Sequence, residues 1–313
     1  MNAIRLRQLV LEAAAHVPFY RRHWKAAGID LTRIYSAVHL DFLPVVRRAD
    51  LLACPIEQRL DQRYIDRGFI DPRADHGAAK RRRARFWNAL REVGYTPGEK
   101  LMLIAEPSYT LGSVLMRWTY VDPGRGEADV FDTYARVRPQ VLYGPLSSLV
   151  LLARRLLASP DVKSRPKLVI STDGQLTDAQ RTLLESTFAA RVADFYGTPE
   201  LGLVAYSKPG ISGYAVLAKE FHLETLRAGN DGCERLIVTD LGGGATPLIR
   251  FDTGHLVRRD LARAGQPIVQ VSGYEVETPK ATSGSYVSPY ATPLEADAMA
   301  GINSIDDIGR ALA

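Results

Sequence analysis

Apolar positions near the start of the chain follow a helical period. Between Ile4 and Ala15 they recur mostly every three or four residues, and Pro18 interrupts the pattern. Further helices are expected over Tyr20–Ala27 and Arg48–Cys54. The pattern therefore predicts a helical lead-in over residues 1–60.

Short apolar runs alternate with helical segments in the middle of the chain. The runs are Gln140–Tyr143, Lys167–Ser171 and Arg191–Phe195, and the helical segments between them are Ser147–Leu157 and Thr177–Phe188. This order is typical of βαβ units, so it predicts a largely parallel sheet within an α/β fold.

Two other regions differ from this alternating pattern. Asp61–Lys80 has no sustained period and carries Gly68, Pro72 and Gly77, so a loop region is expected there. A helix over Phe86–Val93 is expected to follow. After Gly213 the apolar residues form only short runs, which predict four short strands, separated by turns rich in Gly, Asn and Asp. The predicted strands are Tyr214–Leu217, Glu220–Leu226, Arg235–Asp240 and Leu256–Arg259.

The composition is that of a well-packed globular protein. Of 313 residues, 46% are hydrophobic and 24% are charged, which excludes disordered and fibrous classes. The formal net charge of +5 is mild, and the basic residues are scattered except for Lys80–Arg83 with Arg85. A nucleic-acid partner is therefore not expected, because such proteins show longer basic stripes with interleaved aromatic residues.

Cysteine use and hydropathy bear on where the protein works. Cys54 and Cys233 are far apart and lack CxxC spacing, so neither a disulfide framework nor a thiolate zinc site is expected. The first twenty residues are amphipathic, and no apolar run reaches the roughly 18 residues of a spanning helix. A cytoplasmic protein without a membrane partner is predicted.

Four segments in a fixed order carry a family resemblance. The segments are Gln140–Ser147, Lys167–Leu176, Val192–Gly202, and Leu236–Leu241 continuing to Thr246–Gly254. Together they resemble the phenylacetate–CoA ligase and capsular-polysaccharide-synthesis-like branch of the adenylate-forming (ANL) superfamily. The lead-in agrees through Val17–Tyr20, Gly28-Ile29 and Leu43-Pro44, so the likeness covers roughly residues 1–290.

The resemblance implies an architecture. We expect the large N-terminal domain of the adenylate-forming fold, an α/β domain with mixed, mostly parallel sheets, helices and a C-terminal β subdomain. Its core would span residues 61–272, after the lead-in of residues 1–60. Residues 273–313 would form the hinge and a remnant of the small mobile C-terminal domain, which is otherwise missing.

The resemblance also implies a reaction, in which ATP and a carboxylate form an acyl-adenylate that a thiol then intercepts. Enzymes of this class need a Ser/Thr/Gly-rich loop whose backbone amides reach the phosphates. That loop should lie between about Asp61 and Arg85, but Arg67–Lys80 has two isolated glycines and no Ser or Thr. The phosphate loop is therefore predicted to be lost, and contacts from Lys80–Arg83 by charge alone are the less favoured alternative.

A second motif survives with one change. Tyr196-Gly197-Thr198-Pro199-Glu200 matches the family pattern Tyr-Gly-x-Thr/Ser-Glu. The match places Tyr196 against the adenine and Glu200 at the magnesium-associated acid, but Pro199 replaces a hydroxyl residue and offers no side-chain hydrogen bond. The alternative interpretation is a strand-to-helix turn with Glu200 in the first helical turn.

Two further parts depart from the family. In Arg250–His255, His255 stands where an aspartate binds both ribose hydroxyls, while Arg250 matches an arginine that sets the pocket wall. The hinge would be Gly273–Glu277, and Lys280 is the only lysine after it, so the family's C-terminal catalytic lysine has no counterpart. Loss of ATP and magnesium is therefore predicted, with no cofactor and no metal.

His255 is the strongest candidate for a substitute chemistry. With Asp173 and Glu200 as carboxylate partners, it would activate water or a hydroxyl against an acyl bond. Drift in an abandoned pocket is the alternative. The predicted substrate-binding residues are Tyr143, Tyr196, Gly197 and Arg250.

The other histidines and the cysteines receive weaker interpretations. His222 and Glu224 share one face of a predicted strand, and His76 could join the site. The remaining histidines, His16, His23 and His39, are expected at the surface or at caps, and both cysteines are expected to pack as small apolar residues.

Three functions remain in view. The favoured one is an ATP-independent enzyme that hydrolyses or transfers an acyl group held as an ester, amide or thioester in a specialised biosynthetic pathway. The alternatives are an ATP-dependent adenylating enzyme or acyl-CoA ligase, and a non-catalytic protein that binds an acyl intermediate. The expected partner is a small-molecule acyl substrate, with an acyl carrier protein as a further possibility.

Overall fold

The computed structural model describes residues 2–33, 37–66, 75–105, 116–159, 161–162, 164–209, 213–227, 233–258 and 270–274. They form two compact units, one from the residues up to Ala78 with those from Val216 onward, and one from Ala79–Ala215. This division does not test the domains that the resemblance implies, with boundaries after residues 60 and 272, and those domains stay a prediction. Among the described helices, none has the length and apolarity needed to cross a membrane.

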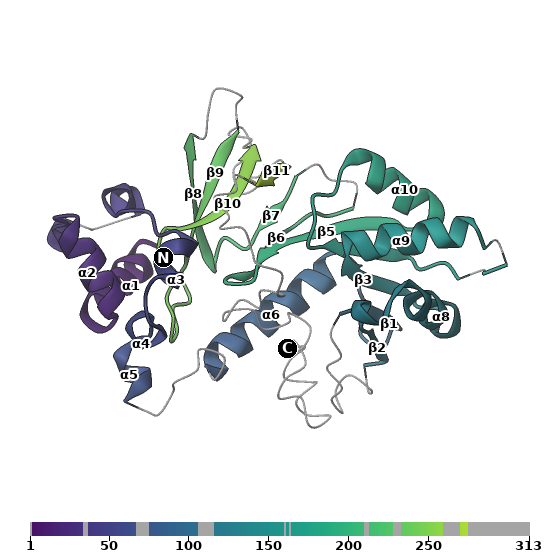
Figure 1. Cartoon of the computed structure of the whole chain (residues 1–313), viewed down its shortest axis with the longest axis horizontal. Helices are drawn as coiled ribbons and strands as arrows, with labels where there is room; N and C mark the ends of the chain where they lie inside the picture. The colour runs from purple at the N-terminus through teal and green to yellow at the C-terminus, as the bar shows by residue number, and fades with distance from the viewer. Residues whose placement is uncertain are drawn as a thin grey trace. The chain divides into compact units, whose positions relative to one another are not determined.

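The second unit is built around a parallel sheet (Figure 1). In the strand order β2-β1-β3-β4-β5-β6-β7, the strands from β2 to β5 run parallel and β6 pairs antiparallel with β5. The strands are β1 (Leu101–Ile104), β2 (Trp118–Val121), β3 (Val141–Pro145), β4 (Leu168–Thr172), β5 (Arg191–Thr198), β6 (Gly202–Tyr206) and β7 (Ala215–Val216). The predicted parallel sheet is therefore confirmed.

Helices cover both faces of this sheet, which explains why its strands read as continuous apolar runs. The helices are α6 (His76–Glu92), η4 (Pro123–Arg125), α8 (Glu127–Val137), α9 (Leu146–Leu157) and α10 (Asp178–Phe188). Side chains of α8, α9 and α10 share one core with Leu142 and Val169. On the opposite face Phe86 of α6 meets the rings of Tyr143 and Phe195 edge to face, at 5.5 and 6.1 Å.

The first unit combines the helical lead-in with an antiparallel sheet. Its helices are α1 (Asn2–His16), α2 (Pro18–Ala26), η1 (Leu31–Arg33), η2 (Ala37–Phe42), α3 (Arg48–Leu52), α4 (Ile56–Arg59) and α5 (Gln62–Ile65). Its sheet has the order β11-β10-β9-β8, from β8 (Phe221–Arg227), β9 (Glu234–Asp240), β10 (Phe251–Arg258) and β11 (Gln270–Tyr274). The lead-in is tied to the sheet where Val46 exchanges backbone hydrogen bonds with Arg250 and Asp252.

The region expected as a loop contains helical structure at both ends. Residues of α5 and the first turns of α6 fall within Asp61–Lys80, so the loop prediction is wrong there, while residues 67–74 lie outside the described residues. The start of α6 is fixed by Asp75, whose Oδ1 accepts a hydrogen bond from the Ala78 amide at 2.9 Å. Pro18, expected to interrupt helical structure, begins α2, because proline lacks only an N–H that the first turn leaves unbonded.

Candidate functional site

The carboxyl ends of β3, β4 and β5 meet at one edge of the parallel sheet. Ligands of open α/β sheets commonly bind at this edge, so its residues are the first candidates. Two glycines let elements approach closely there. A Cβ on Gly144 would lie 2.7 Å from Ile104 Cβ, and one on Gly174 would lie 2.9 Å from Leu146 Cβ.

Asp194 is a buried carboxylate held by hydroxyl groups. Its side chain is 3% exposed, and Ser171 Oγ donates to its Oδ1 at 2.5 Å while the Tyr214 hydroxyl donates to its Oδ2. Burial is the largest influence and raises the pKa of this carboxyl, because the two hydroxyls supply no positive charge. Asp194 was not among the predicted site residues, although it is a charged residue within an otherwise apolar strand.

Asp173 follows β4 at the same edge. Its backbone has φ 52°, in the left-handed region that non-glycine residues rarely adopt. The side chain is exposed, yet the surrounding protein still raises the pKa of the carboxyl by desolvation. Thr172 Oγ1 lies 3.4 Å from Asp173 Oδ1, a long hydrogen bond.

The three other predicted binding residues of this unit are largely built into its packing. Tyr196 is buried and meets the ring of Tyr214 edge to face at 6.2 Å. Tyr143 packs between Phe86 and Phe195. A Cβ on Gly197 would lie 2.4 Å from the Gly202 carbonyl oxygen, so only glycine fits in this hairpin. Their roles in binding a substrate stay predictions.

Glu200 lies in the turn that joins β5 to β6. The alternative of a strand-to-helix turn is therefore wrong, because an antiparallel strand follows. Arg82 Nη2 donates to the Glu200 carbonyl at 2.7 Å, and Arg85 Nη1 lies 3.4 Å from the Leu201 carbonyl. Two arginines of the basic run thus fix the backbone beside Glu200, whose own side chain is buried.

His255 lies on β10 in the first unit and is 6% exposed. Its backbone amide donates to Thr253 Oγ1 at 3.2 Å, and it is paired with Tyr274 of β11. Burial, with a smaller contribution from the Arg48 charge, lowers the pKa of the imidazole to about 4, so it is neutral at pH 7. Because Asp173 and Glu200 belong to the other unit, their pairing with His255 stays a prediction.

Arg250 is committed to contacts within its own unit. Its Nε and Nη2 bind the two oxygens of Glu224 at 3.2 and 3.1 Å, and its Nη1 donates to the carbonyls of Asp41 and Leu43. The expectations that Arg250 sets the pocket wall and binds a substrate stay predictions. His222 lies two residues before Glu224 on β8, so the two side chains share one face of the strand. Burial lowers the pKa of His222, and the nearby Arg250 charge adds to the effect.

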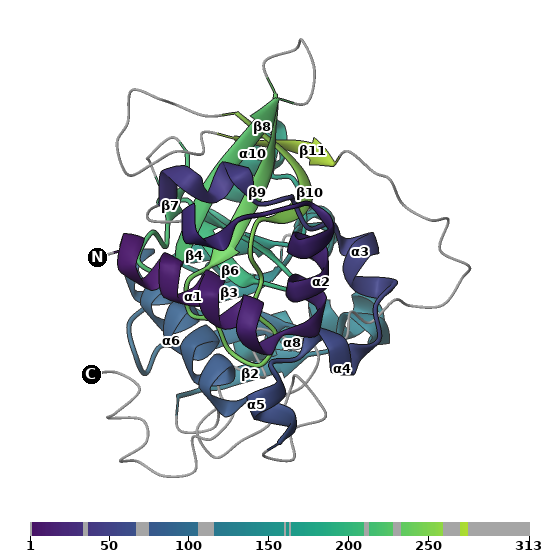
Figure 2. The same cartoon turned by 90° about the vertical axis from the view of Figure 1, so that its left-hand side faces the viewer.

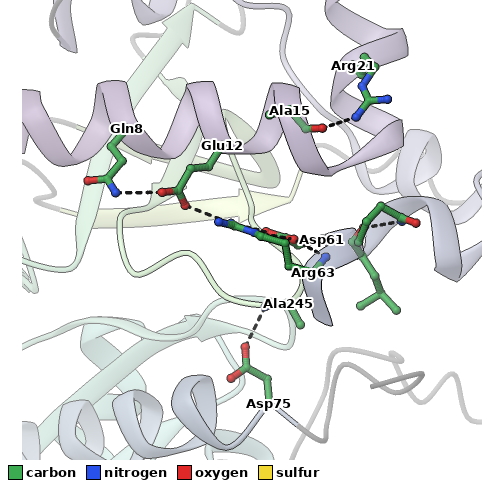
Figure 3. Close-up of polar contacts among 10 residues, drawn as sticks. Gln8, Glu12, Ala15, Arg21, Asp61, Arg63, Asp75 and Ala245 are labelled. Carbon is green, nitrogen blue, oxygen red and sulfur yellow. Dashed lines mark hydrogen bonds and ion pairs between the residues drawn. The ribbon is translucent and has the colours of Figure 1, made fainter. Parts of the chain in front are cut away.

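The flanks of the expected phosphate loop are anchored in an ionic cluster that the sequence did not reveal (Figure 3). Arg63 binds Asp61 at 2.6 Å and Glu12 at 3.2 Å. The Asp61 amide donates to the Ala245 carbonyl, and Asp75 Oδ2 accepts from the Ala245 amide, both at 2.8 Å. Ala245 is therefore hydrogen-bonded to Asp61 and to Asp75, the residues at the two ends of the segment 61–75. The side chain of His76 and residues 67–74, 259–269 and 275–313, including Lys280 and the end of the hinge, lie outside the described residues.

The fold defines the class. The described chain has the fold of the large domain of adenylate-forming enzymes, a parallel-rich sheet with helices followed by a β subdomain, as the resemblance implied. It is similar to a solved structure of 2-hydroxyisobutyryl-CoA ligase in an open conformation, in complex with 2-HIB-AMP and CoA. That match has 18% sequence identity and a TM-score of 0.66, and it covers 85% of this chain and 66% of the ligase.

A second structure of that ligase gives the same result. It is in the postadenylation state with 2-HIB-AMP, and it matches with 20% identity and a TM-score of 0.64 over 85% of this chain. The match covers 65% of the ligase chain. No family model and no curated protein matches the sequence. The comparisons therefore show the fold, shared with ligases.

Proposed function

We propose that this protein acts on an acyl compound without ATP and hydrolyses or transfers the acyl group of an ester, amide or thioester. The observation that carries the proposal is the buried and neutral imidazole of His255. The resemblance implies that this residue replaces the family's ribose-binding aspartate. A neutral imidazole accepts a proton, whereas it cannot accept two hydrogen bonds from a ribose as a carboxylate does.

The reaction follows from this chemistry. His255 takes the proton from water or an acceptor hydroxyl, the oxygen attacks the acyl carbon, and the leaving oxygen, nitrogen or sulfur departs with a proton. Asp173 and Glu200 are the proposed carboxylate partners of the imidazolium. The similar ligase was solved with an acyl-adenylate and CoA, which supports an acyl compound as the substrate class. Thioesters on CoA or on an acyl carrier protein are natural donors.

The sequence supports loss of ATP chemistry. No Ser or Thr occurs in Arg67–Lys80, and Pro199 replaces a hydroxyl residue. Each lost transition-state contact typically costs about 3 kcal/mol, so several losses together lower the rate of adenylation by many powers of ten. We expect no ATP–pyrophosphate exchange with any carboxylate in a panel. Clear exchange above background would establish the ligase instead.

The direct test is turnover of acyl esters, CoA thioesters and pantetheine thioesters. General-base catalysis is typically worth about 10²–10⁴-fold, so His255→Ala should lower kcat by at least about 100-fold. His16→Ala, which removes a half-buried histidine on α1, should retain the activity. Equal activity of the two variants would remove His255 from the mechanism.

A non-catalytic binding protein is the second candidate. It is favoured by the low exposure of His255 and by its low pKa, since a base with a pKa of about 4 is weak. Saturable binding of an acyl compound without turnover would select this alternative.

A further inference from the structure

A hollow of about 550 Å³ is lined by residues of α2, α3 and α4 and of the turn between α3 and α4, in the first unit. Figure 2 shows these three helices as neighbours. We define the α2–α4 hollow by six of the residues that line it, Phe19, Arg22, His23, Cys54, Pro55 and Gln58. Its volume falls within the range of about 300–1,000 Å³ of small-molecule sites. We propose that the α2–α4 hollow binds a small monocarboxylic acid with an apolar body.

One side of the α2–α4 hollow offers hydrogen-bond donors for an acid. Arg22 Nη2 donates to Gln58 Oε1 and lies 3.5 Å from Cys54 Sγ. Within the part of the chain that the structure describes, Nε and Nη1 of Arg22 make no hydrogen bond, so each can donate to a ligand oxygen, and the guanidinium charge strengthens such a bond to a carboxylate.

His23, the next residue of α2, adds a second polar group. Its Nε2 is buried and has no hydrogen-bond partner among the described residues. A buried ring nitrogen without a partner is costly, so a ligand oxygen that accepts from Nε2–H would relieve this cost. Arg22 and His23 together therefore point to a ligand that accepts hydrogen bonds.

The other residues that line the α2–α4 hollow indicate the apolar body and the charge of the ligand. Phe19 stacks on the His23 ring with centroids 5.3 Å apart, and Cys54 and Pro55 extend the apolar surface. Asp50 also lines the hollow, and its Oδ2 accepts the Arg47 amide at 2.8 Å. This carboxylate opposes a doubly charged phosphate more than a singly charged acid. A monocarboxylate with an apolar body therefore fits the hydrogen-bond donors on one side of the hollow and the apolar surface on the other.

Benzoate is the probe for the test, titrated into the full chain and followed by saturation-transfer NMR and calorimetry. We expect saturable binding that Arg22→Ala weakens at least tenfold, because it removes charge-assisted hydrogen bonds. The matched control is Arg21→Ala on the same helix. Arg21 donates to the Ala14 carbonyl and also to the Ala15 carbonyl, the second of which Figure 3 shows. Its loss should leave benzoate binding unchanged.

Two further measurements keep the test decisive. Arg22→Gln retains hydrogen bonding and removes the charge, so it replaces Arg22→Ala if that variant unfolds at a lower temperature. Bound benzoate should also slow alkylation of Cys54 by iodoacetamide relative to Cys233, since only Cys54 lies in the hollow. The proposal is overturned by absence of saturable binding, by equal loss in the Arg21 and Arg22 variants, or by inorganic phosphate that binds as tightly as benzoate. None of these readouts depends on the proposed acyl reaction.

Discussion

Asp194 and Glu224 show two ways in which this chain accommodates a carboxylate away from water. In the second unit, Asp194 receives hydrogen bonds from the hydroxyls of Ser171 and Tyr214. In the first unit, Glu224 receives two N–H groups and a full positive charge from Arg250. Burial raises the pKa of both carboxyls, and the Arg250 charge opposes the rise at Glu224. Removing Glu224 leaves a buried guanidinium without its counter-charge, whereas removing Asp194 leaves only neutral hydroxyls, so the two clusters should respond differently to mutation.

The largest expected effect is at the charged cluster. Glu224→Ala leaves the Arg250 guanidinium, whose side chain is 5% exposed, without its counter-charge. Breaking a buried pair from one side typically costs about 3–5 kcal/mol, so the free energy of unfolding in urea should fall by about that amount.

The matched control is an exposed ion pair of the same type. Glu92 binds Lys208 at 2.5 Å, and the two side chains are 52% and 34% exposed. Glu92→Ala should cost no more than about 1 kcal/mol, because solvent screens the charges. If Glu224→Ala were no more costly than Glu92→Ala, the distinction between the two clusters would fail.

The periodic features of the fold were accessible from the sequence. The runs Gln140–Tyr143 and Lys167–Ser171 became β3 and β4, because a strand buried on both faces is apolar throughout. The shared face of His222 and Glu224 follows from the two-residue period of a strand. Such local rules do not need knowledge of distant partners.

The partners within the candidate site were not accessible in this way. Asp194 is held by Ser171, 23 residues earlier, and by Tyr214, 20 residues later. No spacing rule joins such positions, since the sheet alone brings them together. The start of α6 was missed for a different reason: Gly77 obscured the helical pattern, although Asp75 is a typical N-cap residue.

His255 sharpens the comparison because it is a buried base near a positive charge. Its folded pKa of about 4 lies below the ordinary value of 6.5, so the unfolded chain binds more protons between these pH values. The titration of His255 alone should therefore lower the free energy of unfolding of the wild type by about 3 kcal/mol as the pH drops from 7 to 4. His255→Gln does not titrate at this position and should lose correspondingly less.

The measurement is the free energy of unfolding in urea at pH 7, 6, 5 and 4 for both proteins. A curve for His255→Gln that runs parallel to the wild type would show that the imidazole is not held neutral by burial.

The smallest effect is expected at the hydroxyl cluster and has the opposite sign with pH. Burial raises the folded pKa of Asp194 above its ordinary value of 3.8, so this carboxyl contributes stability below about pH 4 that is lost as the pH rises through the folded pKa. Asp194→Asn removes that loss, and its stability relative to the wild type should increase between pH 4 and pH 8.

Tyr214→Phe tests the other side of the same cluster. It removes a hydroxyl that donates to Asp194 and should cost about 1–3 kcal/mol, because it leaves a buried acceptor without one of its donors. In an Asp194→Asn background the cost should be smaller, because an amide carries no charge to leave unsolvated, and a double-mutant cycle measures the difference. Equal costs in the two backgrounds would mean that the Tyr214 hydroxyl does not act through the charge on Asp194.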